Sequence, residues 1–340
     1  MLKVGLIDVD GHHFPNLALM KISAYHKSVG DEVVWANAME QYDLVYQSKV
    51  FDETYSEDIA WMPRAEVIYK GGTGYLRGRR GDEEFPFEIY HCGKWRKQEG
   101  ADHIFQGGYF AVEEREIYRE QLVYEVEHIY PDYGLYPGLT KDTAYGYLTR
   151  GCPRQCAFCG VAEKEGCVSR KVANLDEFWR GQRYIKLLDP NLLCCKDRID
   201  LLKQLVYSGA YVDFTQGLDI RAVNDQVIDL INRIKLKEIH FAWDNPEQDL
   251  TEEFAYYAAG AKHKPHGQYG TVYVLTNYGS TMEENLYRVY TLRDLGYDPY
   301  IMIYDKPNAP KEIRDLQRWC NNRRCFRTVT KFEEYSRKKG

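Results

Sequence analysis

Short apolar runs alternate with helical stretches in the first 80 residues of the chain. The run KVGLIDVD at residues 3–10 predicts a buried strand, and apolar residues at helical spacing from Asn16 to Val29 predict a helix that Gly30 ends. The runs EVVWA, YDLVYQS and AEVIYKGG follow as further strand candidates. Because this alternation is typical of small parallel sheets, we expect residues 1–80 to form a Rossmann-like α/β domain.

Six more strand candidates follow from residue 145 onward, with helical sequence between them. They are AYGYLT, RYIKLLD, YVDFTQ, EIHFAWD, TVYVLTN and PYIMIYD. Asn224 is placed as a helix cap, and Thr281 with Glu284 matches a capping box. Repeated β-α units of this length predict a parallel sheet with right-handed crossovers, so residues 139–310 are expected to form a partial (β/α)6 or closed barrel. In such barrels the chemistry lies at the C-terminal ends of the strands.

The rest of the sequence lacks this alternation of strand and helix patterns. Residues 81–138 are polar and aromatic, and we interpret them as an insertion and linker. Residues 311–340 predict a C-terminal helical extension. A length of 340 residues suits one large α/β domain with a smaller partner domain.

The composition argues against several classes of protein. Hydrophobic residues make up 44% of the chain, and no apolar run approaches the roughly 20 residues that a membrane span needs. The N-terminus reads at once as a strand, without the basic region and apolar core of a secretory signal, so we expect a cytoplasmic protein. The net charge of −6 argues against a wholly basic nucleic-acid-binding surface, although arginines gather at residues 77–80 and 318–324.

Three of the nine cysteines lie in one loop, just beyond the first strand of the second block. The segment GYLTRGCPRQCAFCGV places Cys152, Cys156 and Cys159 in the spacing C-x-x-x-C-x-x-C. Because cytosolic thiols are kept reduced, clustered cysteines indicate metal or redox chemistry. Three thiolates held so closely can ligate three irons of a 4Fe-4S cluster and leave the fourth iron open. A structural zinc site is the alternative, although zinc generally takes four ligands, usually from two C-x-x-C pairs.

The triplet, with Phe158 directly before its third cysteine, resembles the signature of the radical S-adenosylmethionine superfamily. The six strand units match the partial barrel of that family. The resemblance implies that S-adenosylmethionine binds the open iron and is cleaved, with one electron from a flavodoxin- or ferredoxin-type donor, to methionine and a 5′-deoxyadenosyl radical. This radical then abstracts a hydrogen atom from the substrate, so the resemblance implies an enzyme. Cofactors carry such radical chemistry, while the protein positions groups and excludes side reactions.

The same resemblance implies polar contacts to the cofactor at the strand ends. The matching positions here are Asp189, Asn191, Gln216, Asp219, Arg221, Asp244 and Asn277. Where the family often has glycine-glycine-glutamate after the second strand, this chain has LLDPNLL, so we expect Asp189 or Asn191 to hold the methionyl amine. The alternative role for each of these residues is a helix cap or a loop hydrogen bond.

A Rossmann-like domain before a radical barrel resembles the cobalamin-binding subgroup of the superfamily. The matching positions are Asp10, His12, Ser48, Gly71 and Gly72. Asp10 and His12 stand as in the cobalt-ligating motif D-x-H-x-x-G, but Pro15 replaces its glycine. Bound cobalamin implies methyl transfer or a related radical reaction. The alternative is a domain that has kept the fold and lost the ligand.

The other six cysteines form no second tight triplet, and we interpret them as buried or incidental. They are Cys92, Cys167, Cys194, Cys195, Cys320 and Cys325. A non-catalytic alternative remains, in which the cluster is structural or senses redox state. That alternative needs a fourth protein ligand, for which Cys167 is the candidate.

The sequence leaves the substrate open between a small molecule and a nucleic acid or peptide. A nucleic acid or peptide would use the arginines at residues 77–80 and 318–324, with Trp319 as a stacking surface. A small-molecule substrate needs only a closed pocket. The net acidity of the chain favours a small molecule over a nucleic acid or peptide.

Overall fold

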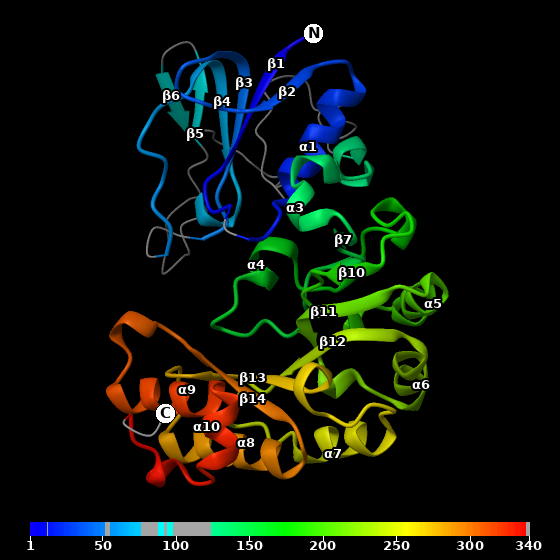
Figure 1. The fold of residues 1–340 in the computed structure, drawn as a ribbon, viewed down its shortest axis with the longest axis vertical. Helices are drawn as coiled ribbons and strands as arrows, with labels where there is room; N and C mark the ends of the chain where they lie inside the picture. Colours follow the sequence, from blue (N-terminus) through cyan, green and yellow to red (C-terminus); the bar gives the residue numbers. More distant parts are fainter. Residues whose placement is uncertain (12, 52–54, 76–87, 92–93, 98–123, 338–340) are drawn as a thin grey trace. The chain divides into compact units, whose positions relative to one another are not determined.

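A computed structural model of the protein describes residues 1–11, 13–51, 55–75, 88–91, 94–97 and 124–337. The chain divides into two compact units, the first comprising Met1–Tyr145 with Asp176–Arg180 and the second comprising Gly146–Leu175 with Gly181–Gly340. Each unit is an α/β structure whose largest sheet is mainly or wholly parallel (Figure 1). Within the described ranges, no helix has the length and apolar character needed to cross a membrane.

The sheet of the first unit has the strand order β2-β1-β3-β4-β5-β6. Its strands are β1 (Lys3–Asp8), β2 (Glu32–Trp35), β3 (Gln41–Ser48), β4 (Arg64–Gly71), β5 (Glu88–His91) and β6 (Lys94–Lys97). Strands β1 to β4 pair in parallel, which confirms the parallel sheet predicted for this part of the chain. Strands β5 and β6 extend the sheet as antiparallel neighbours.

Helix α1 (Leu17–Ser28) packs on the sheet of the first unit. It begins at Asn16, whose side chain accepts a hydrogen bond from the backbone N–H of Leu19 at 3.2 Å. Leu19 and Ile22 are buried against Leu6 of β1. The apolar spacing read from the sequence is therefore the face that holds this helix on the sheet.

The second sheet has six parallel strands in the order β14-β13-β12-β11-β10-β7, and all of them except β7, which ends at Gly146, lie wholly in the second unit. They are β7 (Thr143–Gly146), β10 (Tyr184–Leu187), β11 (Tyr211–Leu218), β12 (Lys235–Ala242), β13 (Thr271–Thr276) and β14 (Asp298–Ile303). Each falls within one of the six predicted runs or overlaps it closely. Neighbouring strands follow one another along the chain, as repeated β-α units require.

Four helices connect these strands and lie along one side of the sheet (Figure 1). They are α5 (Arg198–Ser208), α6 (Asp225–Arg233), α7 (Thr251–Gly260) and α8 (Met282–Asp294). Two predicted helix starts are confirmed. The Asn224 side chain caps α6, and Thr281 forms a capping box with Glu284 at the start of α8.

Short elements surround the cysteine loop and the end of the chain. They are α3 (Pro137–Thr140), β8 (Thr149–Arg150), α4 (Val161–Glu165), β9 (Arg170–Lys171), α9 (Lys311–Asn321) and α10 (Arg323–Thr328). Strands β8 and β9 pair antiparallel on either side of the cysteines. Trp319 of α9 is fully buried, and its indole N–H donates to the carbonyl of Val329 at 2.8 Å. The expectation that Trp319 offers a stacking surface to a nucleic acid is therefore wrong, because its ring belongs to the core.

Candidate metal and cofactor site

The cysteine loop starts from a glycine that no other residue can replace without strain. Gly151 has φ +82°, and a Cβ atom there would stand 2.3 Å from the carbonyl oxygen of Val168. The next residue, Cys152, donates its backbone N–H to the carbonyl of Gly166 at 3.1 Å. The Gly151 N–H donates to the Glu165 carboxylate, also at 3.1 Å. These contacts fix the start of the loop against the turn that follows α4.

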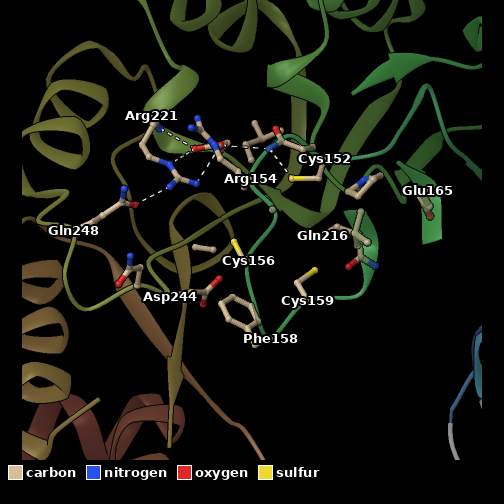
Figure 2. A pocket seen from close by; sticks show the side chains of 18 of the residues that line it. Cys152, Arg154, Cys156, Phe158, Cys159, Glu165, Gln216, Arg221, Asp244 and Gln248 are labelled. Carbon is tan, nitrogen blue, oxygen red and sulfur yellow. Dashed lines mark hydrogen bonds and ion pairs between the residues drawn. The ribbon is translucent and has the colours of Figure 1, made fainter. Parts of the chain in front are cut away.

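The three cysteines of the loop line one cavity of about 410 Å³ in the second unit (Figure 2). Burial and the neighbouring thiols of Cys159 and Cys152 raise the pKa of Cys156 above its ordinary value. The pKa of Cys159 is raised too, mainly by burial. The charged forms of these thiols are thus unfavourable without a cation, and a bound metal would compensate their negative charge.

Most of the predicted cofactor contacts lie on the wall of the same cavity. These residues are Phe158, Asn191, Gln216, Asp219, Arg221 and Asp244. They come from the cysteine loop and from the segments at the C-terminal ends of β10, β11 and β12. The sequence prediction that polar groups meet at this edge of the sheet agrees with this placement.

Asn191 connects a cysteine to the acidic part of the wall. Its Nδ2 donates to the Sγ of Cys152 at 3.4 Å and to the Oδ2 of Asp219 at 3.3 Å. Its Oδ1 accepts from the backbone N–H of Cys194 at 3.3 Å and so caps the 3₁₀ turn Leu192–Cys194. The capping role and the contact with the cysteine thus occur together in one side chain.

Asp219 is held between two arginines. Its carboxylate accepts from the Nε of Arg221 at 2.7 Å and from the Nε of Arg154 at 2.6 Å. Burial alone would raise the pKa of Asp219, but the hydrogen bonds and charges of the two arginines hold it below its ordinary value. Arg221 also donates to the side chain of Gln248 at 2.8 Å. Two cations around one carboxylate leave this part of the wall with a net positive charge.

Asp244 and Phe158 form another part of the wall. Burial raises the pKa of Asp244 to about 6, although the N–H of Leu275 donates to its carboxylate at 3.2 Å. The ring of Phe158 meets that of Tyr278 edge to face, with centroids 5.6 Å apart. A buried carboxylate of this kind favours a cationic partner.

Two predicted residues do not line the cavity. The buried carboxylate of Asp189 accepts hydrogen bonds from the backbone N–H of Thr149 at 2.5 Å and of Leu148 at 3.1 Å. Asn277 has φ +63° and donates its side-chain N–H to the carbonyl of Tyr304 at 2.8 Å. Both residues hold neighbouring backbone in place, which is the loop role considered as the alternative for them.

The candidate cobalamin residues of the first unit gather around the C-terminal ends of β1, β3 and β4. Asp10 accepts from the backbone N–H groups of Val50 and Phe51, and Ser48 accepts from Asn16 at 2.8 Å. Gly71 pairs with Ser48 in the sheet. His12 lies outside the described residues.

Gly72 has a local structural explanation. It has φ +98°, and a Cβ atom there would stand 2.3 Å from the carbonyl oxygen of Lys49. Close packing of two backbone segments therefore accounts for this glycine without any ligand.

Sequence reasoning missed several residues of the cavity wall. They include Tyr147, Arg154, Glu165, Asn245 and Gln248. Arg154 could have been found, because it lies between the first two cysteines. Cys194, interpreted as incidental, lies beside this wall, with its Sγ 3.6 Å from the Oδ2 of Asp219.

Comparison of the chain with models of known protein families finds no match, and comparison with curated proteins finds no relative.

Proposed function

We propose that the protein is a radical S-adenosylmethionine enzyme whose 4Fe-4S cluster is held by Cys152, Cys156 and Cys159. The observation that carries the proposal is that all three thiols of the C-x-x-x-C-x-x-C loop line one cavity beside the C-terminal ends of parallel strands. The cluster, when bound, supplies the electron that cleaves S-adenosylmethionine to methionine and the 5′-deoxyadenosyl radical. The chain's own residues hold the cluster and position the cofactor.

The number of cysteines in the loop favours a cluster over a single structural zinc ion. A structural zinc ion generally takes four protein ligands, whereas three thiolates in one loop suit a 4Fe-4S cluster whose fourth iron has no protein ligand. Cys167, the candidate fourth ligand of a non-catalytic cluster, is exposed and does not line the cavity.

The polar wall suits the amino-acid end of S-adenosylmethionine. Of the two residues expected to hold the methionyl amine, Asn191 lines the cavity and Asp189 does not. We assign the amine to Asn191 and to the carboxylate of Asp244, because an ammonium group beside it would compensate the negative charge that burial disfavours. We assign the carboxylate to Arg221, because guanidinium groups bind carboxylates well and Asp219 is already shared with Arg154.

The finer fold assignments form part of the same proposal. The sequential order of the six parallel strands supports a partial (β/α)6 barrel, and the order β2-β1-β3-β4 supports a Rossmann-like first unit, because doubly wound sheets can begin in this order. A reduced flavodoxin or ferredoxin in the cytoplasm would supply the electron. His12, the candidate cobalt ligand, lies outside the described residues, so no step is assigned to cobalamin.

Anaerobic reconstitution tests the proposal. The full chain is loaded with iron and sulfide, reduced with dithionite and mixed with S-adenosylmethionine, and 5′-deoxyadenosine is measured. We expect cleavage by the wild type, none by Cys156→Ala, and unchanged cleavage by Cys167→Ala, an exposed cysteine off the cavity wall. Cleavage that persists in Cys156→Ala would contradict the assignment. Loss of the cluster in Cys167→Ala would favour the four-ligand, non-catalytic alternative.

A further inference from the structure

A second group of potential metal ligands lies within the sheet of the second unit, away from the cysteine loop. Asp213 of β11 is the register partner of Glu238 on β12, and His240 lies two residues beyond Glu238. Phe241, next to His240, packs on Phe254 of α7. Because side chains alternate along a strand, His240 and Glu238 point to the opposite side of the sheet from the helices.

The three side chains converge on one point. One ligand atom from each of Asp213, Glu238 and His240 lies within 4.8 Å of the other two. The Nε2 of His240 stands 3.7 Å from the Oε2 of Glu238. Ligand atoms around an ion with bonds of about 2.1 Å lie roughly 3–4 Å apart, so only small side-chain movements are needed to coordinate one.

The other polar atoms of these residues have the contacts found around metal ligands. The Nδ1 of His240 lies 3.2 Å from the carbonyl oxygen of Phe214, and because a carbonyl only accepts, Nδ1 carries the proton. The Nε2 atom is then the ring nitrogen that faces the carboxylate of Glu238, and its lone pair can coordinate a cation when Nε2 carries no proton. The hydroxyl of Thr215 donates to Asp213 at 3.0 Å. Such outer contacts orient metal-binding histidines and carboxylates.

The group is shielded on one side and accessible on another. The side chains of Asp213 and His240 are only 9% and 12% exposed. The ring of Tyr273 stacks on that of His240, with ring centroids 5.3 Å apart. A cavity of about 460 Å³ adjoins Glu238 and His240. The other residues that line it are Gln268, Thr271, Tyr273, Tyr300 and Arg323. An ion bound here would have coordination positions open towards this cavity.

Lys186 would compete with a bound cation for the carboxylate of Asp213. It is the register partner of Asp213 on β10, and its Nζ lies 3.4 Å from the Oδ2 of Asp213. The Lys186 side chain is 30% exposed, so it can withdraw towards solvent when a cation approaches. One lysine balances the charge of only one of the two carboxylates.

We propose that Asp213, Glu238 and His240 bind a divalent transition-metal ion such as Mn²⁺, Fe²⁺ or Zn²⁺, with Lys186 as an internal competitor. One imidazole and two carboxylates form a ligand set for this class of ion. The site is separate from the cysteines, so it does not depend on the function proposed above.

Mn²⁺ is the probe that separates this site from the thiols, because thiolates select softer metals. We expect the cluster-free full chain to bind one Mn²⁺, measured by loss of the free-ion signal in electron paramagnetic resonance. His240→Ala and Asp213→Asn should weaken binding at least about tenfold, and Thr215→Val about tenfold. Lys186→Met should strengthen it. His266→Ala is the matched control, because His266 faces a single carboxylate, that of Asp298 at 3.5 Å.

A measurement on the wild type covers the case in which a variant fails to fold. With ¹⁵N-labelled histidine, the electron spin echo of bound Mn²⁺ should show one directly coordinated histidine nitrogen. The proposal is overturned if neither the wild type nor Lys186→Met binds Mn²⁺ saturably, if binding survives in folded His240→Ala, or if the echo shows no histidine nitrogen. Cleavage of S-adenosylmethionine plays no part in these readouts, so they fail or succeed independently of the proposed function.

Discussion

The side-chain amide of Asn191 donates to the Sγ of Cys152 at 3.4 Å and to the Oδ2 of Asp219 at 3.3 Å. The residue thereby joins the proposed cluster ligand to the carboxylate that both arginines hold. A hydrogen bond to a cluster sulfur stabilises the more negative, reduced state and raises the reduction potential. The potential of the cluster is therefore a direct measure of this contact.

Loss of the Asn191 amide should lower that potential. A hydrogen bond contributes about 1 kcal/mol, which corresponds to about 40 mV for a one-electron couple. We expect a fall of this order in Asn191→Ala and at least as much in Asn191→Asp, which keeps the acceptor for the N–H of Cys194 but loses the donor. Potentials are read from redox titrations followed by electron paramagnetic resonance. Asn245→Ala, on the same cavity wall, is the control, and an equal fall there would show that the contact with Cys152 is not the cause.

Gly151 and Gly181 offer a matched test of the cysteine loop. Both have φ near +90°, at +82° and +95°, but only Gly151 has backbone in the space that a Cβ would fill. We expect Gly181→Ala to cost about 1 kcal/mol of unfolding free energy and Gly151→Ala to cost more than about 3 kcal/mol. Only Gly151→Ala should also lose iron after reconstitution. Urea unfolding and iron analysis measure the two effects, and similar costs in both variants would rule out the steric argument.

Asp189 should make stability depend on pH. Burial raises its pKa to about 6, against an ordinary value of 3.8. The folded state therefore holds this proton more tightly than the unfolded chain does, so its stabilising effect is complete below about pH 4 and is lost as pH rises through about 6. The side-chain amide of the Asp189→Asn variant cannot be ionised, so the unfolding free energy of this variant relative to wild type should rise between pH 4 and 7, by up to about 3 kcal/mol.

Urea unfolding of the cluster-free chain at both pH values provides this comparison. Asp200→Asn is the control, because the Asp200 side chain is 77% exposed. The difference in unfolding free energy between Asp200→Asn and wild type should stay nearly constant with pH. If the difference between Asp189→Asn and wild type is constant as well, burial does not shift the pKa of the Asp189 carboxyl.

The strands could be predicted from the sequence because their signal is local. In the run YVDFTQ the apolar residues Val212 and Phe214 alternate with the polar residues Asp213 and Thr215, as side chains on the two faces of a strand do, and β11 contains this run. The pairing of Asp213 with Glu238 could not be predicted, because the register between β11 and β12 shifts at Val212 and Asp213. A single irregularity of this kind decides which side chains become neighbours.

The candidate site likewise contains some residues that could be predicted from the sequence and others that could not. The cysteines could be predicted because their spacing is contained in eight residues, from Cys152 to Cys159. The ion pair of Arg154 with Asp219 joins positions 65 residues apart, which no local pattern reveals. Asp189 and Asn191 are two residues apart and equally plausible in sequence, yet only Asn191 lines the cavity, because the carboxylate of Asp189 binds the backbone of the preceding strand segment.

Arg221 should contribute to the affinity for S-adenosylmethionine through its positive charge on the cavity wall. A hydrogen bond between charged groups contributes about 1.5–3 kcal/mol, so Arg221→Met should raise the dissociation constant by roughly ten- to a hundredfold. Arg221→Lys should restore only part of the lost affinity. A planar guanidinium group can bind the carboxylate of the cofactor and Asp219 at the same time, and an ammonium group lacks this geometry. Equilibrium dialysis with the reconstituted protein measures the affinity. Arg233→Met is the control, because Arg233 is half exposed and pairs with Asp229 within α6. Equal affinities in wild type and Arg221→Met would show that the carboxylate of the cofactor does not bind to Arg221.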